Sequence, residues 1–345
     1  MTFVQNHKTN AGCPPEIDAC LSQRLEKYLQ GIVSSFSTEP EPCVINGHDV
    51  CNTIFRVLTS HRHNYLSRGR SEAYRHRVLS WIEQAVRANE PVAFYYDLGG
   101  GYRASLRPGV EKLTFTVGLG ELLALRQIAR FRNQVRAIYS PGVRFSIVID
   151  NLCAYFTNDI ALDQTHGYVE QLRRLIDELG LDHYVGVLVE SELFSVEQFR
   201  HESQQLRPLS NATELSAGEH ENVARFLGRL CASQEAEDRV NRYACACAAT
   251  ERLLKPVIRG IRLTQRATPE TLCFRSFPGG DQRIQSGDVA FAYIADESVK
   301  PVLITSRNVD HYQRIRLDAP AYFPPTISEV VVARPLSSPA TAAGG

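Results

Sequence analysis

A carboxylate at the end of a predicted buried strand is the strongest chemical signal in this sequence. The apolar, β-branched stretch Val143–Ile149 is followed at once by Asp150. A carboxylate at the ligand edge of a sheet can be tuned, by burial beside a hydrogen-bond partner, for acid–base work or amine binding. The alternative is that Asp150 simply caps a helix or a turn. We therefore treat Asp150 as a candidate catalytic residue.

A glycine-rich loop, Gly99-Gly-Gly-Tyr-Arg, follows another short apolar strand, Pro91–Tyr96. Backbone N–H groups in such a loop can approach an anionic ligand. It is not a Walker loop, because no Gly-Lys-Ser/Thr follows, and Ala104 breaks the dinucleotide fingerprint Gly-x-Gly-x-x-Gly. A bare tight turn explains the glycines equally well, but Arg103 and Arg107 favour an anion site.

Other polar residues come with ordinary structural explanations. Glu121 begins a predicted helix, where a carboxylate complements the helix dipole. Asp159 belongs to Thr-Asn-Asp, which is common turn chemistry. Tyr102 either lines a pocket for an aromatic substrate or belongs to the core. These residues become candidates only through the resemblance given below.

Several familiar reactive arrangements are missing from the sequence. His61, His63 and His76 lack the spacing of metal ligands, and neither a facial triad nor a Gly-x-Ser-x-Gly elbow occurs. Cys245 and Cys247 form a single Cys-x-Cys pair, without the second pair that a zinc site needs. The small residues around them indicate buried thiols on a helix. We therefore expect no metal and no cofactor, and chemistry carried by carboxylates and arginines.

Strands and helices alternate through the central part of the chain. The predicted elements, in order, are a strand at 91–96, a helix at 119–131, a strand at 143–149, a helix at 166–179 and a strand at 184–190. This order predicts an α/β fold: a Rossmann-like, mainly parallel sheet with helices on both faces. Ligands bind beyond the carboxyl ends of such strands, which selects residues 97–105, Asp150-Asn151 and Glu190-Ser191-Glu192.

The length and composition predict two lobes. The chain of 345 residues exceeds what one hydrophobic core usually supports. From Val257 onward short strands replace long helices, which predicts a smaller C-terminal α+β lobe. The predicted organisation is a loosely ordered lead-in over 1–45, a Rossmann-like core over 46–195, a helical linker with a small mixed-sheet lobe over 196–335, and a disordered tail over 336–345.

Charge and cysteine usage limit the partners and the location. Lys plus Arg equals Asp plus Glu, at 38 each, so no electrostatic footprint for nucleic acid exists. No apolar run reaches the length needed to span a membrane, and the N-terminus does not resemble a signal peptide. Nine cysteines without paired spacing argue against a secreted disulfide framework. We expect a cytoplasmic protein that acts on a small molecule.

Five short motifs occur in a collinear order between roughly residues 50 and 310. They are Glu90-Pro-Val-Ala-Phe-Tyr-Tyr, Gly118-Leu-Gly-Glu-Leu-Leu-Ala-Leu, Ile138-Tyr-Ser-Pro-Gly-Val-Arg-Phe-Ser-Ile-Val-Ile-Asp, Tyr155-Phe-Thr-Asn-Asp-Ile and Ile261-Arg-Leu-Thr-Gln-Arg-Ala. This set resembles the isocyanide (isonitrile) synthase family, also called the pyoverdine/dityrosine biosynthesis family. The block from Tyr139 to Asp150 and the stretch Gly120–Leu125 carry the most specific part of the resemblance.

The resemblance implies a transferase of natural product biosynthesis. Such an enzyme takes an aromatic amino acid and a pentulose phosphate, which donates one carbon, and converts the amine to an isocyanide without a metal. Downstream biosynthetic enzymes, such as an oxygenase, are the partners that it implies. The site must hold a phosphate, a carboxylate and an amine, and must move protons. The candidate catalytic residues are Glu121, Asp150, Asp159 and Lys112, and the candidate substrate-binding residues are Arg103, Arg107, Arg262 and Tyr102.

Three departures from the family pattern bear on the reaction. Arg103 stands where the family's loop has a lysine, and a guanidinium, with a pKa above roughly 12, cannot form an imine at neutral pH. Gly118 replaces the aspartate of its motif, and Gln265-Arg266 replaces a histidine. Lys112 is a nearby lysine that a shifted loop brings into play. The alternatives are the family reaction, a related C–N transformation, or a catalytically silent amino-acid-binding or partner subunit.

Overall fold

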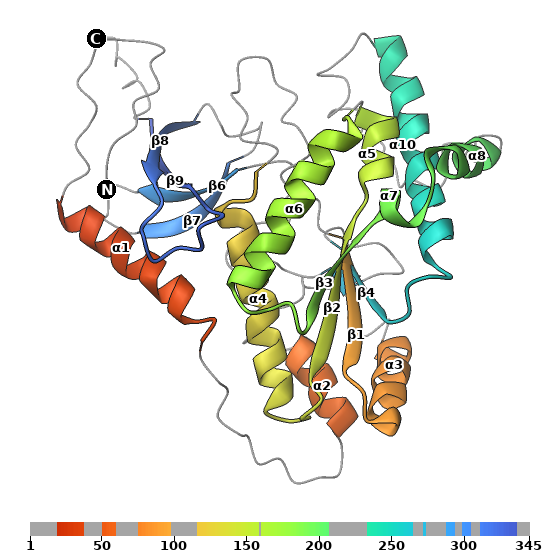
Figure 1. Cartoon of the computed structure of the whole chain (residues 1–345), viewed down its shortest axis with the longest axis horizontal. Coiled ribbons are helices and arrows are strands. Elements are labelled where there is room, and N and C mark those ends of the chain that lie inside the picture. Colours follow the sequence, from red (N-terminus) through yellow and green to blue (C-terminus); the bar gives the residue numbers. More distant parts are fainter. Residues whose placement is uncertain are drawn as a thin grey trace, which may run out of the picture.

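The computed structural model contains a parallel sheet flanked by helices and a smaller second sheet beside it (Figure 1). The residues that it describes are 19–37, 50–59, 75–97, 116–158, 160–206, 233–264, 272–273, 288–293, 299–304 and 311–336.

The first sheet forms the central layer of the larger lobe. Its strands are β1 (Val92–Asp97), β2 (Val143–Ile149), β3 (Val185–Val189), β4 (Ile261–Thr264) and β5 (Leu272–Cys273). They lie in the order β3-β2-β1-β4-β5, and each neighbouring pair is parallel. One face carries α4 (Leu119–Arg136) and α6 (Leu162–Glu178), and the other carries α3 (Arg75–Ala88) and α10 (Ser233–Leu254) (Figure 1). The predicted α/β fold with a parallel sheet is therefore confirmed.

Three phenylalanines fill the space between the sheet and α4. Phe94 of β1 and Phe145 of β2 are register partners, so their rings project from the same face of the sheet. The two rings stack with centroids 5.3 Å apart, and Phe131 of α4 meets both rings edge-on. All three side chains are fully buried. Helix α4 continues to Arg136, five residues beyond the predicted helix end, and Val135 within this extension is also fully buried.

Short helices follow two of the strands directly. Helix α5 (Asn151–Asn158) begins two residues after β2 ends, and α7 (Glu190–Leu193) begins immediately after β3. Helix α8 (Val196–Leu206) then packs with α5 and α10 around a small cluster of buried residues, which are Leu152, Cys153, Phe199, Ala246 and Ala249. A separate helix, α2 (Val50–Thr59), packs against α3 and α4. Helices α5, α7, α8 and α10, which come from distant parts of the chain, thus lie near the carboxyl ends of β2 and β3.

Strands β4 and β5 extend the first sheet, although residues 196–335 were predicted to form a helical linker and a separate small lobe. The chain passes through α10 and returns so that Phe94 pairs with Ile261 and Tyr95 pairs with Arg262. The hydrophobic pattern predicted short strands from Val257 onward, but such a pattern does not identify the neighbouring strand. The core lobe thus includes a segment from the C-terminal third of the chain.

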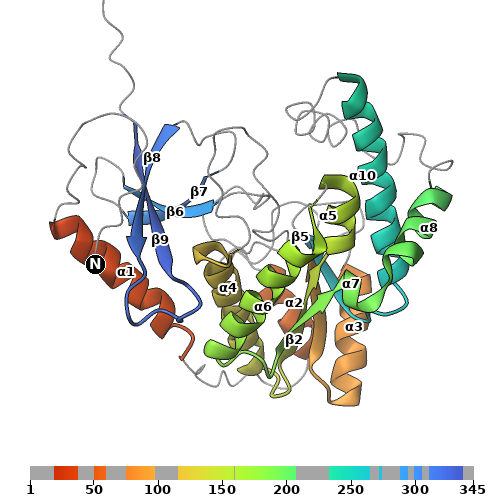
Figure 2. The same ribbon diagram turned by 45° about the horizontal axis from the view of Figure 1, so that its top comes forward.

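The second sheet is mixed. Its strands are β6 (Asp288–Tyr293), β7 (Val299–Ile304), β8 (Tyr312–Asp318) and β9 (Glu329–Pro335), in the order β7-β6-β9-β8. The pairs β6–β7 and β8–β9 are antiparallel, whereas β6–β9 is parallel. Helix α1 (Ala19–Ser34) lies against this sheet (Figure 2) and buries Leu25, Leu29 and Ile32. This helix, within the segment predicted to be loosely ordered, is therefore packed.

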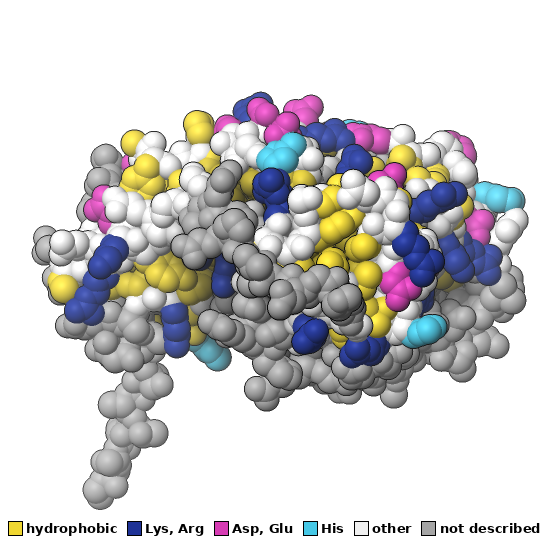
Figure 3. Space-filling model, turned by 90° about the horizontal axis from the view of Figure 1, so that it is seen from below, with side chains coloured by type: hydrophobic (Ala, Val, Ile, Leu, Met, Phe, Trp, Pro, Cys, Tyr) yellow, Lys and Arg dark blue, Asp and Glu magenta, His cyan; other side chains and the backbone are white. Residues whose placement is uncertain are grey.

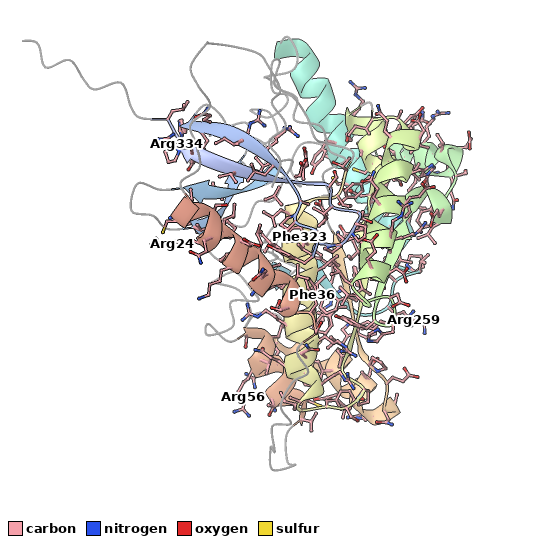
Figure 4. All side chains as sticks on the ribbon, turned by 60° about the vertical axis from the view of Figure 1, so that its left-hand side comes forward. Arg24, Phe36, Arg56, Arg259, Phe323 and Arg334 are labelled. Atoms are coloured by element: carbon pink, nitrogen blue, oxygen red, sulfur yellow. The ribbon has the colours of Figure 1, made fainter. Side chains whose placement is uncertain are left out.

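The connection between β8 and β9 joins the two lobes. Within the smaller lobe, the Tyr322 hydroxyl donates to the backbone carbonyl of Glu26 on α1 at 3.3 Å. The Thr326 hydroxyl and backbone N–H donate to the Glu178 carboxylate at 2.8 and 3.1 Å. Phe323, which is buried, lies where the smaller sheet meets the larger lobe (Figure 4). Both lobes therefore contribute to one continuous hydrophobic core.

The surface carries charges of both signs. On the face seen in Figure 3, basic and acidic side chains are interspersed with apolar ones. Within the described ranges, no helix is long and apolar enough to cross a membrane.

Candidate functional site

Polar residues follow two neighbouring strands at the carboxyl edge of the parallel sheet. Asp150 and Asn151 come directly after β2, and Glu190 and Ser191 come directly after β3. The last residues of these strands, Ile149 and Val189, are register partners. The two polar pairs therefore lie side by side at the edge where ligands bind in such sheets.

Glu190 is a buried carboxylic acid with an unusual environment. Its side chain is only 1% exposed, and its Oε2 accepts a hydrogen bond from the Cys153 backbone N–H at 3.0 Å. Burial, reinforced by the nearby charge of Asp150, raises the pKa of Glu190 to about 8. The Thr250 hydroxyl approaches closely enough to oppose this rise, although among the described residues neither it nor Glu190 Oε1 makes a well-formed hydrogen bond. Glu190 therefore holds a proton at neutral pH.

Asn151 ties the ends of β2 and β3 together. Its side chain is fully buried, and its Nδ2 donates to Ser191 Oγ at 2.8 Å and to Thr165 Oγ1 at 3.2 Å. Its Oδ1 accepts the Ser191 backbone N–H at 3.1 Å. Ser191 Oγ also lies 3.1 Å from His166 Nε2. The network fixes the start of α7, and with it the position of Glu190.

We expect Asn151→Ala to lower the free energy of unfolding by about 2–3 kcal/mol, because it leaves buried donors and acceptors without partners. Urea unfolding followed by circular dichroism measures this change. Asn133→Ala, a partly exposed site on α4, is the matched control and should shift stability by less than about 0.5 kcal/mol. Equal effects of the two substitutions would show that the Asn151 network contributes little.

Asp150 lies at this edge and is partly exposed. Its backbone carbonyl accepts the Ala154 N–H at 3.0 Å, so the residue also begins the hydrogen bonding of α5. Its charge acts on both Glu190 and Cys153. Both sequence interpretations therefore describe it: Asp150 is a helix-start residue and also a partly exposed carboxylate beside a buried acid.

Glu121 and Arg262 are held by other side chains or backbone groups. Glu121 Oε2 accepts the Gly118 N–H at 2.8 Å, and its Oε1 accepts the Tyr168 hydroxyl at 3.1 Å. Both carboxylate oxygens of Glu121 thus stabilise the start of α4, as the structural explanation of this residue predicts. Arg262 pairs with Glu251 at the end of α10, at 2.7 Å. The other candidates, Tyr102, Arg103, Arg107, Lys112 and Asp159, lie outside the described residues.

Glu190 was not among the predicted catalytic residues. The sequence did carry one signal for it, because Glu190 ends the predicted strand at 184–190 and lies in the segment that the ligand-edge rule selected. The burial that makes Glu190 chemically distinctive comes from α5 and α10, whose approach the local sequence does not reveal.

Among the described residues, no group of three or more His, Cys, Asp or Glu side chains is arranged to hold a metal ion.

Comparisons with known proteins agree with this architecture. The sequence model of a family described as pyoverdine/dityrosine biosynthesis protein matches residues 113–242, which include α4, β2, β3 and the candidate site. The crystal structure of the PvcA protein from Pseudomonas aeruginosa superposes with a TM-score of 0.61 at 18% sequence identity. The match covers 83% of this chain and 100% of that chain.

A second match is weaker. The crystal structure of tyrosyl-tRNA synthetase from Aeropyrum pernix has a TM-score of 0.36 and 14% identity, over 62% of this chain and 52% of its own. That likeness is too low to indicate a shared fold. Among curated proteins, none matches this chain significantly. The resemblance predicted from the motifs is confirmed: residues 113–242 match the model of the pyoverdine/dityrosine biosynthesis family, and the fold is similar to that of PvcA.

Proposed function

We propose that this protein is a specialised-metabolism enzyme that converts the amine of an amino acid, with a sugar phosphate as one-carbon donor, or performs a related C–N transformation. The family match and the PvcA-like fold support a biosynthetic role. The observation that carries the proposal is the pair of carboxyl groups at the ligand edge, with a buried, protonated Glu190 behind a partly exposed Asp150.

This pair suits proton transfer. Building a new bond at an amine requires that protons leave the nitrogen and reach the departing oxygen groups. A carboxylate that faces solvent can accept such a proton, and a neighbouring acid with a pKa near neutrality can hold one. We assign the substrate contact to Asp150, and we assign to Glu190 the role of a positioning residue that acts through it.

A second candidate function is a catalytically silent amino-acid-binding or partner subunit. Glu121 favours it, because both of its carboxylate oxygens are engaged in structural contacts. Gly118 favours it as well, since it stands where the family's motif has an aspartate.

We also propose a cytoplasmic location, with which the cysteines agree: no disulfide joins those whose side chains the structure describes.

The test is to incubate the purified protein with each of the twenty amino acids, with and without ribulose 5-phosphate, and to follow products by mass spectrometry. Sugar-dependent formation of a product that has gained one carbon is the expected result. Stabilisation by an amino acid without turnover would support the silent subunit and overturn the enzymatic proposal.

We expect Asp150→Asn to lower turnover about 100-fold, the usual contribution of a general acid or base. Asp182→Asn is the matched control, because Asp182 is exposed and precedes β3 at the opposite edge of the sheet. Unchanged turnover in Asp150→Asn would remove Asp150 from the mechanism while leaving the reaction itself in place.

A further inference from the structure

Two thiols from distant parts of the chain meet behind the candidate site. Cys153 lies in the first turn of α5 and Cys247 lies on α10, 94 residues later. Their Sγ atoms are 4.0 Å apart, and both are thiols. A disulfide requires about 2.05 Å between the sulfur atoms, so the two sulfurs must approach by about 2 Å for the bond to form. We propose that Cys153 and Cys247 form an oxidisable pair, a site of reversible disulfide formation that takes a peroxide as its oxidant.

The surroundings of the two sulfurs differ. Cys153 is 1% exposed within the cluster that joins α5, α8 and α10. Cys247 is partly exposed. Cys245 is buried two residues earlier on α10, and side chains two residues apart on a helix point in nearly opposite directions. The geometry therefore selects Cys247 over Cys245 as the partner of Cys153.

The chemistry proceeds in two balanced steps. The Cys247 thiolate attacks a peroxide oxygen and the O–O bond breaks, which gives a sulfenic acid and a hydroxide; the hydroxide takes up the proton that the thiol released and becomes water. The Cys153 sulfur then attacks the Cys247 sulfur, the S–O bond breaks, and the departing hydroxide takes the thiol proton as a second water. The hydrogen bond to Cys247 and burial raise the pKa of Cys153 well above its usual range, which assigns the first step to Cys247.

The bond would tie the start of α5 to α10 beside Glu190. The Cys153 backbone N–H donates to Glu190 Oε2, so the linked residue directly supports the buried acid. A link across 94 residues also restricts the unfolded chain strongly. The oxidised protein should therefore unfold at a Tm several degrees higher than the reduced protein.

Peptide mapping tests the pair. The full chain is reduced, freed of reductant, treated with an equimolar amount of hydrogen peroxide, alkylated and digested with trypsin without reduction. We expect the peptide 145–173, which contains Cys153, to be joined to the peptide 243–252, which contains Cys245 and Cys247. Dithiothreitol should release the two peptides and reverse the rise in Tm.

Cysteine variants identify the partner. Cys245→Ser should retain the link, whereas Cys247→Ser should lose both the link and the change in Tm. Cys20, which is exposed on α1, reports how far oxidation of surface thiols has gone. Extensive oxidation of Cys20 with Cys153 still reduced in the wild-type protein, or a link from Cys153 to Cys245, would overturn the proposal. The wild-type digest shows by itself whether the two peptides become linked, so that result does not depend on the folding of a variant.

Discussion

Replacing Glu190 with glutamine is expected to raise the free energy of unfolding at pH 9 by about 3–5 kcal/mol and to leave it nearly unchanged at pH 5. The pKa of Glu190 rises from 4.5 to about 8 because the carboxyl group is buried and Asp150 lies nearby. Above its unfolded-state pKa, the unfolded chain releases this proton while the folded chain keeps it. The stabilisation that comes from the protonated Glu190 carboxyl is therefore fully present below pH 4.5 and is lost as the pH rises through about 8.

Glutamine removes this loss because it stays neutral at every pH. Its amide oxygen can still accept the Cys153 N–H that Glu190 Oε2 accepts now. Urea unfolding at a series of pH values compares the two proteins. We expect the wild-type curve to fall between pH 5 and pH 9 relative to the variant curve.

Glu192→Gln is the matched control, two residues away. Glu192 is exposed and forms two hydrogen bonds with Arg173, at 2.9 and 2.6 Å, which lower its pKa. Its contribution to stability depends on pH in the opposite direction: it is present above the unfolded-state pKa of Glu192 and is lost on acidification. Because the pair is exposed, the loss should stay below about 1 kcal/mol. Parallel pH profiles for wild type and Glu190→Gln would show that no charge is buried at residue 190.

The second large effect is expected for Gly260→Ala, which should lower the free energy of unfolding by about 3 kcal/mol or more. Gly260 has φ +147°, a conformation that residues with a side chain rarely adopt. A Cβ atom there would lie 2.6 Å from the Ala93 carbonyl oxygen. That oxygen belongs to β1 in the middle of the sheet, so it cannot move aside cheaply.

Gly180→Ala separates backbone conformation from collision. Gly180 has φ +65° at the end of α6, but a Cβ atom there meets nothing within 4 Å. Its substitution should cost only about 1 kcal/mol. Thermal and urea unfolding of both variants provide the comparison. Similar losses at the two positions would show that the contact with Ala93 is not decisive, and that the pairing of β4 with β1 tolerates a side chain at residue 260.

Much of the fold was readable from the sequence because its signals are local. The β-branched run before Asp150 predicted β2, and apolar spacing predicted α4 and α6 with errors of a few residues at their ends. Alternation of strands and helices predicted the parallel sheet, and its carboxyl edge pointed to Asp150 and Glu190. Each of these inferences needs only neighbouring residues and the general geometry of α/β folds.

Tertiary structure decided the relations between distant residues. Pairing of Phe94 with Ile261 placed β4 in the first sheet. The hydrogen bond from the Tyr168 hydroxyl gives the second carboxylate oxygen of Glu121 a structural partner at the start of α4. Packing of α10 against α5 brought Cys247 to Cys153 and enclosed Glu190. A hydrophobic pattern reports which face of an element is buried, but not which element covers it. The pKa of Glu190 depends on that covering, because desolvation is set by every group that displaces water from the carboxyl.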